Sequence, residues 1–205
     1  MGLSPITEIR FDFLNGLNIL VPQNRKALTM AKLSLPSLKK HLNDKSKDEL
    51  VKEICEFYKK FPSVNDYYKN FLTERGRNEV LSKYKKIIND EFLPSRGIGK
   101  LNLKVARKAI SDFKKISTSC YDIADVMIYY VELGVYFSNL HDQVSENFYL
   151  NMEIMFDLAL QYIQMTKQEE KFNLRCKIIV DNALDMGCGF HDCLSDSFAE
   201  YFGDM

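Results

Sequence analysis

Apolar residues recur along this chain with the period of an α-helix, and charged residues occupy the positions between them. The clearest case begins at Ser46, which has Glu49 at the spacing of a capping box. The segment that follows carries one apolar face, formed by Leu50, Ile54, Phe57 and Phe61. Pro62 ends this segment, so the pattern predicts an amphipathic helix just before it.

The same periodicity predicts further helices over residues 63–72, 76–93, 102–115, 118–137, 145–165, 167–186 and 192–202. Ser63 and Asp66 have capping spacing at the start of the first, and Asp192 is placed to cap the last. Segment 118–137 is apolar almost all round, which is typical of a central helix. Alternating strand patterns are missing. We therefore expect an all-α fold, either an antiparallel helical bundle or a short helical-hairpin solenoid of about eight or nine helices.

The first 29 residues differ from the rest. Their apolar stretch FLNGLNILV is interrupted by asparagine and glycine, and it lacks the basic start and small-residue exit of a secretory signal. We expect residues 1–29 to be a poorly ordered N-terminal extension; a short helix docked on the domain is the alternative. Residues 30–205 are expected to form a single all-helical domain. No apolar run reaches the ~18 residues of a membrane span, so no membrane partner is expected.

Charge divides this domain into two halves, although the whole chain is neutral. The basic half, residues 30–115, contains 21 Lys and Arg against 11 Asp and Glu, a net charge of +10. The acidic half, residues 116–205, contains 4 against 15, a net charge of −11. Such asymmetry indicates a surface that faces a polyanion, or two oppositely charged surfaces that attract each other.

The stretch FLPSRGIGKLNLKVARKAI, residues 92–110, is the first candidate site. Glycines allow backbone N–H groups to turn toward an anion, and the start of the following helix adds its dipole. The predicted anion-binding residues are Arg96, Gly97, Gly99, Lys100, Lys104, Arg107 and Lys108. The partner would be a nucleic acid or an acidic protein surface, and scarce aromatic residues give no support to sequence-specific reading. A solvated basic connector is the alternative, because the Walker A spacing is absent.

A second candidate site lies on the predicted central helix. One stripe of this helix contains Asp122, Asp125, Tyr129, Glu132 and Tyr136. Carboxylates held close together act as acid and base or bind cations, and with His191 and Asp192 they suggest a hydrolase site. They can equally pair with lysines and arginines of the basic half, because a buried carboxylate needs a partner. No motif identifies a nucleophile, so no catalytic residue is assigned.

The short segment CGFHDC raises the question of a metal site. Cys188, His191 and Cys193 are zinc-ligand types, but a fourth ligand and a second cysteine pair are missing. We predict no metal and no cofactor, and expect a glycine turn with Phe190 in the core. The five cysteines are odd in number and mostly scattered, which favours a reducing, cytoplasmic setting over a secreted one.

Four blocks of the chain resemble an uncharacterised family of small bacterial proteins, a domain of unknown function. The blocks begin with KLSLPSLKKHL, FLPSRGIGK, MIYYVELGVYFSN and GCGFHDC, and the likeness runs from Ala31 to Phe202. The resemblance implies that the P-x-R-G loop, the helix ARKAI and the turn GFHD are shared features. It implies no activity. Cys188 and Cys193 are not a fixed part of the family pattern, which weakens the zinc interpretation further.

Three functional hypotheses follow from these patterns. The first is a cytoplasmic binding or interaction module whose basic face engages a polyanion or an acidic partner. The second is a self-associating structural protein, a homo-oligomer held by its complementary basic and acidic halves. The third is a metal-assisted hydrolase.

Overall fold

The computed structural model describes residues 33–97, 99–141, 144–187 and 189–203. Over these ranges the chain forms nine α-helices and no strand, packed antiparallel, which confirms the all-α prediction. The helices are α1 (Leu35–Asn43), α2 (Lys47–Lys60), α3 (Pro62–Leu72), α4 (Glu74–Phe92), α5 (Leu103–Ile116), α6 (Cys120–Leu140), α7 (Glu146–Thr166), α8 (Glu170–Asp181) and α9 (Phe190–Phe202). None of the helices in the described ranges is long and apolar enough to cross a membrane.

Contacts within the chain divide it into two units, Met1–Leu50 and Val51–Met205. The described part of the first unit contains α1 and the first turn of α2, and the second unit contains everything that follows. The extension predicted for residues 1–29 lies outside the described residues. That prediction, and the single domain expected from residue 30 onward, therefore stay predictions.

The start of α2 is the predicted capping box. The backbone N–H of Ser46 donates to the Glu49 carboxylate at 2.8 Å, and the N–H of Glu49 donates to the Ser46 hydroxyl at 3.3 Å. The capping predicted for Ser63 and Asp66 is wrong. Helix α3 begins at Pro62, whose missing N–H is tolerated in the first turn, and the buried Asp66 carboxylate instead binds Lys83 at 2.5 Å.

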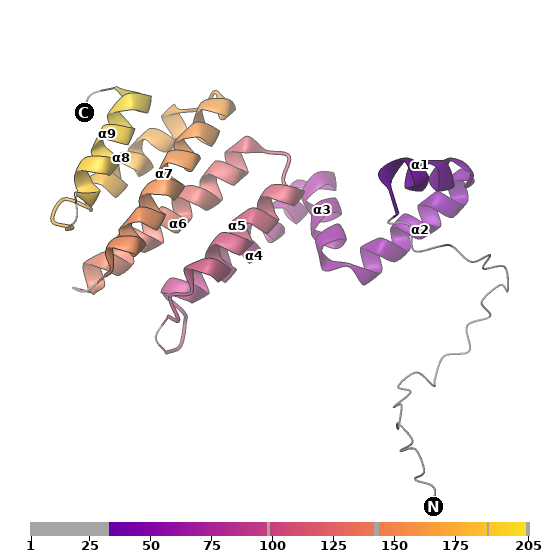
Figure 1. Ribbon diagram of the computed structural model, residues 1–205, viewed down its shortest axis with the longest axis horizontal. Helices are drawn as coiled ribbons and strands as arrows, with labels where there is room; N and C mark the ends of the chain where they lie inside the picture. Colours follow the sequence, from indigo (N-terminus) through magenta and orange to yellow (C-terminus); the bar gives the residue numbers. More distant parts are fainter. Residues whose placement is uncertain (1–32, 98, 142–143, 188, 204–205) are drawn as a thin grey trace, which may run out of the picture. The chain divides into compact units, whose positions relative to one another are not determined.

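The core of the second unit is built around α6, which is buried almost all round as its sequence predicts. Figure 1 shows α6 running beside α7 on one side and the α4–α5 pair on the other, and the contacts agree. Phe92 of α4 joins these helices. Its ring centroid lies 5.4 Å from Tyr130 of α6 and 6.4 Å from Phe148 of α7. Such edge-to-face packing fixes the three helices against one another.

Helix α9 begins earlier than predicted. Gly189 adopts a left-handed conformation with φ of +69°, and Phe190 directly after it is fully buried against Tyr149, with 4.8 Å between ring centroids. Asp192 therefore lies within the first turn of α9 and does not cap it. Burial of Phe190 decides where this helix starts, and the expected place of Phe190 in the core is confirmed.

Candidate functional site

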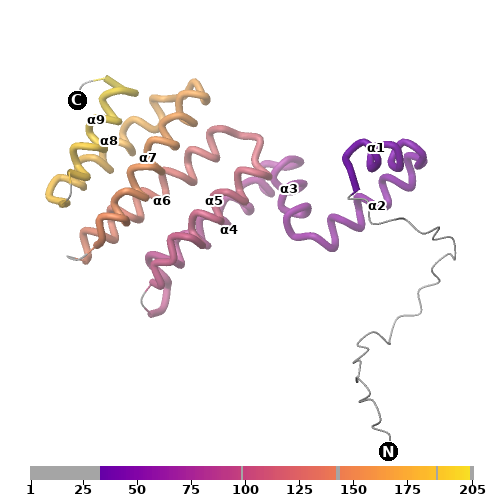
Figure 2. Tube along the Cα trace, viewed as in Figure 1, coloured from indigo at the N-terminus to yellow at the C-terminus, as the bar shows by residue number. Residues whose placement is uncertain are grey.

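The glycines of the loop that connects α4 to α5 (Figure 2) are explained by the conformation and packing of the loop backbone. Gly97 has φ of +78°, a conformation that residues with a Cβ rarely adopt. A Cβ at position 99 would lie 2.4 Å from the carbonyl oxygen of Phe92 and 2.6 Å from that of Glu91. The tight return of the chain onto the end of α4 therefore accounts for both glycines without any ligand.

The N-terminus of α5 already holds an anionic group of the same chain. The backbone N–H of Asn102 donates to the carboxylate of Glu91 at 3.1 Å, and the N–H of Leu101 donates to the Glu91 carbonyl at 2.8 Å. Asn102 itself caps the helix, accepting from the N–H of Val105 at 3.4 Å. Because a carboxylate occupies this position, an external anion would be held here chiefly by side chains.

The cations of α4 are each bound to a carboxylate. These pairs are Arg75 with Glu79, Arg77 with Asp122, Lys83 with Asp66, Lys85 with Asp125 and Lys86 with Asp90. Three of them join α4 to another helix, and two are local i,i+4 pairs. The lysines of α4 that precede the candidate loop in sequence are thus taken up by internal contacts.

Most cations of α5 also have partners. Lys108 and Lys115 both bind Asp112, and their hydrogen bonds hold the pKa of the Asp112 carboxyl below its usual range. Lys114 lies over the ring of Tyr162, 4.8 Å from its centroid. Arg107 donates to the side-chain oxygen of Asn151 on α7, a neutral group that leaves the guanidinium charge uncompensated.

Arg96, Lys100 and Lys104 are different. All three are exposed, and none has a hydrogen bond or ion pair with the described part of the chain. With Arg107 they form what we call the basic loop surface, which spans the α4–α5 loop and the first turns of α5. The structure thus keeps four of the seven residues predicted for anion binding as uncompensated charges.

A groove of about 510 Å³ lies between α3, α4 and α5. Lys83, Lys108 and Lys115 reach into it, but Asp66 and Asp112 on its walls bind all three. Its floor includes the buried Tyr84. Burial and the neighbouring Asp66 and Asp112 raise the pKa of Tyr84 to about 12. The polar groups of this groove therefore satisfy one another.

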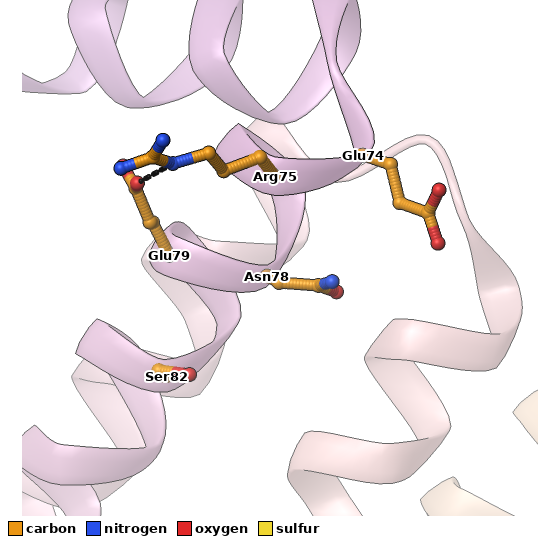
Figure 3. A pocket seen from close by; sticks show the side chains of 5 residues that line it. All are labelled: Glu74, Arg75, Asn78, Glu79 and Ser82. Atoms are coloured by element: carbon orange, nitrogen blue, oxygen red, sulfur yellow. Dashed lines mark hydrogen bonds and ion pairs between the residues drawn. The ribbon is translucent and has the colours of Figure 1, made fainter.

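A second hollow lies along the exposed face of α4, lined by Glu74, Arg75, Asn78, Glu79 and Ser82. Figure 3 shows these side chains along a single helix, with Arg75 bound to Glu79 at 3.0 Å. Both members of this pair are largely exposed. Side chains from one helix that point outward do not converge on a common point, so this hollow has no features of a catalytic or ligand site.

The three carboxylates of the predicted polar stripe of α6 all form internal ion pairs. Asp122 is buried and accepts two hydrogen bonds from Arg77, both 2.5 Å long. The same guanidinium donates to the hydroxyl of Ser119, the N-cap of α6, at 3.2 Å. Planar, bidentate pairing of this kind locks α4 to the start of α6.

The other two carboxylates of the stripe, Asp125 and Glu132, converge on Arg175 of α8. Arg175 donates to both oxygens of Glu132, at 2.7 and 2.8 Å, and to Asp125 at 2.6 Å. Asp125 also binds Lys85 at 2.7 Å. Burial alone would lower the pKa of the Arg175 guanidinium, but the hydrogen bonds and charges of Glu132 and Asp125 outweigh it and raise that pKa. Asp122 and Asp125 thus pair with Arg77 and Lys85 of the basic half, as the alternative interpretation expected, whereas the partner of Glu132 belongs to the acidic half.

Sequence reasoning missed Arg175, because it looked for partners only in the basic half. A signal was present, because Arg175 lies on the apolar face of α8, whose buried positions are Phe172, Cys176, Ile179 and Val180. An arginine among the apolar positions of an amphipathic helix needs a carboxylate nearby.

His191 and Asp192 lie in the first turn of α9 and contact each other, with 3.3 Å between Nδ1 and a carboxylate oxygen. No hydrogen bond or ion pair in the described ranges joins them to Asp122, Asp125 or Glu132. Cys188 lies outside the described residues. Within the part of the chain that is described, no group of three or more His, Cys, Asp and Glu side chains is arranged to hold a metal ion.

Comparison with known proteins gives one relationship. The model of a family described as "Family of unknown function (DUF6155)" matches residues 33–191, most of the chain. No curated protein and no solved structure matches. The match confirms the predicted resemblance to a family of unknown function.

Proposed function

The chain belongs to DUF6155, a family of unknown function, and from its own geometry we propose that it is a non-catalytic binding module that engages a polyanion through the basic loop surface. One observation carries this proposal. From Arg75 to Lys115, the only cations without a partner among the described residues are Arg96, Lys100 and Lys104, which follow one another in sequence. Unpaired charges gathered in a loop and the first turn of the helix after it are the electrostatic footprint of an anionic partner.

These side chains are suited to binding because no internal ion pair has to be broken first. A lysine already bound to a carboxylate must give up that pair before it binds a phosphate, so its net contribution to the binding free energy is small. Arg96, Lys100, Lys104 and Arg107 face no such cost from an internal carboxylate. If the four neutralise phosphates of duplex DNA, the logarithm of the binding constant should fall with that of the salt concentration with a slope of about −3 to −4.

Catalysis receives no support from the polar stripe. Asp122, Asp125 and Glu132 already accept hydrogen bonds from Arg77 and Arg175, so none is available as a free acid or base. Self-association through the two charged halves receives less support too, because Asp122 and Asp125 bind Arg77 and Lys85 of their own chain. We place the module in the cytoplasm, in keeping with the free thiols of Cys55, Cys120, Cys176 and Cys193.

The test is fluorescence anisotropy with labelled single- and double-stranded DNA and RNA, at low and at near-physiological salt. The variant Arg96→Glu/Lys100→Glu/Lys104→Glu reverses the three unpaired charges of the basic loop surface. A matched control reverses three exposed lysines elsewhere, Lys69→Glu/Lys167→Glu/Lys177→Glu, with the same change in net charge.

We expect binding that weakens with salt and that the loop variant reduces by at least about tenfold, while the control variant loses far less. Absence of binding at low salt would refute the polyanion proposal and would turn attention to an acidic protein surface. Equal losses in the two triple variants would show that overall charge, and not the basic loop surface, governs binding.

A further inference from the structure

Helix α2 is amphipathic, yet none of its residues is buried. The large apolar side chains of Ile54 and Phe57 are 42% and 41% exposed, and Phe61 just after the helix is 50% exposed. The rings of Phe57 and Phe61 lie together, with 5.8 Å between their centroids. Apolar residues at this spacing normally form the buried face of a helix, so within the described ranges this face lacks the cover that its sequence pattern anticipates.

Aromatic residues of α3 continue the apolar surface. Tyr58 of α2 meets Tyr68 of α3 edge to face, with 6.4 Å between ring centroids. A hollow of about 400 Å³ lies here, lined by Ile54, Cys55, Tyr58, Tyr68, Lys69, Leu72 and Thr73. Leu72 and Phe71 at the end of α3 are 66% and 59% exposed. The surface thus has both a ridge, on α2, and a hollow beside it that can receive an apolar side chain.

The apolar residues of α2 have the spacing that is found where two helices pack side by side along a coiled-coil seam. Ile54, Phe57 and Phe61 follow the three-four spacing of the a and d positions of a heptad. One flank of this seam is apolar, with Val51 and Tyr58. The other flank is charged, with Glu53 and Lys60, and Lys60 also forms an exposed i,i+4 ion pair with Glu56 at 3.6 Å.

We propose that this face is a self-association surface on which α2 pairs antiparallel with α2 of a second copy. In an antiparallel pair each flank meets the same flank of the partner helix. Glu53 then faces the second copy's lysine at position 60, and Lys60 faces its glutamate at position 53, so the charges are complementary on both sides of the twofold axis. The other flank brings Val51 and Tyr58 together.

The match between the flanks of two antiparallel α2 helices identifies a second copy of the chain as the partner that binds this face. In a parallel pair, the charged flank of one helix would face the apolar flank of the other, which is unfavourable for both. A foreign helix would have to match an apolar seam, an apolar flank and a flank with one negative and one positive charge. Another copy of α2 meets all these requirements when it runs in the opposite direction.

The area of the interface limits the affinity that we expect for the dimer. A stable dimer buries roughly 1,200 Å² or more, and a helix of this length pairs only marginally by itself. Phe71 and Leu72 beside the hollow are therefore expected to join the interface. We expect a reversible dimer with a dissociation constant on the order of micromolar, at the weak end of specific association. This surface is separate from the basic loop surface, and it does not depend on the proposed polyanion binding.

The experiment measures the mass of the full-length protein by sedimentation velocity over a wide concentration range. Lys60→Glu places two negative charges against each other on both sides of the axis, and should weaken the dimer by about tenfold or more. The swap Glu53→Lys/Lys60→Glu restores opposite charges and should recover most of the affinity. Lys59→Glu, on the outer face of α2, is the matched control and should leave the dimer unchanged.

Ile54→Asp should abolish the dimer, and circular dichroism should show that the fold survives, because Ile54 is not part of the core. A monomer at every concentration would overturn the proposal, and would leave the face to another segment of the chain or to a different protein. A dimer that tolerates Ile54→Asp would place the interface elsewhere. A dimer that is lost in Lys60→Glu but not recovered by the swap would overturn the antiparallel pairing.

Discussion

Arg175 is the cation on which the middle of the α6 stripe depends, and replacing it by methionine removes its charge while keeping much of its apolar length. In the Arg175→Met protein, Asp125 retains Lys85 at 2.7 Å. Glu132 has no other hydrogen bond or ion pair within the described residues, so its carboxylate becomes uncompensated. The substitution therefore tests whether the pairing of these carboxylates matters for stability.

The magnitude follows from burial. Removing one partner of a buried ion pair costs roughly 3–5 kcal/mol, because the remaining charge loses its compensation. The Arg175 and Glu132 side chains are 30% and 31% exposed, whereas that of Asp125 is 12% exposed. Water can therefore solvate part of the orphaned Glu132, and we expect a loss of about 2–3 kcal/mol. For a chain of this size, that loss lowers the melting temperature by about 4–12 °C.

The assay is urea unfolding followed by circular dichroism, with Arg75→Met as the control. Arg75 also binds a glutamate, but at 91% exposure and with an i,i+4 partner on its own helix, so its loss should cost at most about 0.5 kcal/mol. Adding Glu132→Gln to Arg175→Met removes the orphaned charge and should recover about 1 kcal/mol. If Arg175→Met costs no more than Arg75→Met, the inference that the carboxylates of α6 rely on buried pairing is wrong.

Two further predictions test single features of the α3–α5 region. The pKa of Tyr84 is raised from 10 to about 12, so the stability that its neutral phenol contributes is full below pH 10 and is lost as the pH rises from 10 to 12. In Tyr84→Phe the free energy of unfolding, measured by equilibrium denaturation, should therefore fall less over this window, by up to roughly 2–3 kcal/mol. An unchanged dependence of the unfolding free energy on pH would contradict the buried phenol. Gly99→Ala should destabilise the protein by about 1–3 kcal/mol in the same assay, because its Cβ would lie against the carbonyl oxygens of Phe92 and Glu91. Gly97→Asn should cost less, at most about 1 kcal/mol, because the space there is open and asparagine tolerates positive φ better than most residues. Equal effects would mean that the close approach at Gly99 relaxes freely.

Local signals in the sequence were read correctly where the structure depends on neighbours along the chain. The capping box at Ser46 and Glu49 forms as predicted, since its hydrogen bonds span three residues. Helix α6 is central because its sequence is apolar almost all round, apart from one stripe of carboxylates. The same kind of reading failed at Asp66, where a distant lysine attracted the carboxylate away from a cap.

The residue types of the candidate sites could be predicted from the sequence, but the residues with which they form ion pairs and hydrogen bonds could not. The sequence shows a basic loop and an acidic stripe, but it does not show that Glu91 occupies the start of α5, or that Arg77 reaches Asp122 across 45 positions. The availability of Arg96, Lys100 and Lys104 is likewise visible only once the partners of the other cations are known. A charged side chain is available to a ligand only if it is not already bound in an internal ion pair, and the ion pairs that form depend on which helices pack together.

By itself, then, the sequence determined the helices, their apolar faces and the separation of charge along the chain, because helix periodicity and capping are interactions between residues three or four positions apart. Tertiary structure alone decided, for the residues that the structure describes, which carboxylate binds which cation, which basic side chains stay unpaired, and which apolar face of α2 remains uncovered. These outcomes depend on contacts between residues far apart in the sequence, which form only when the helices pack and exclude water from between them.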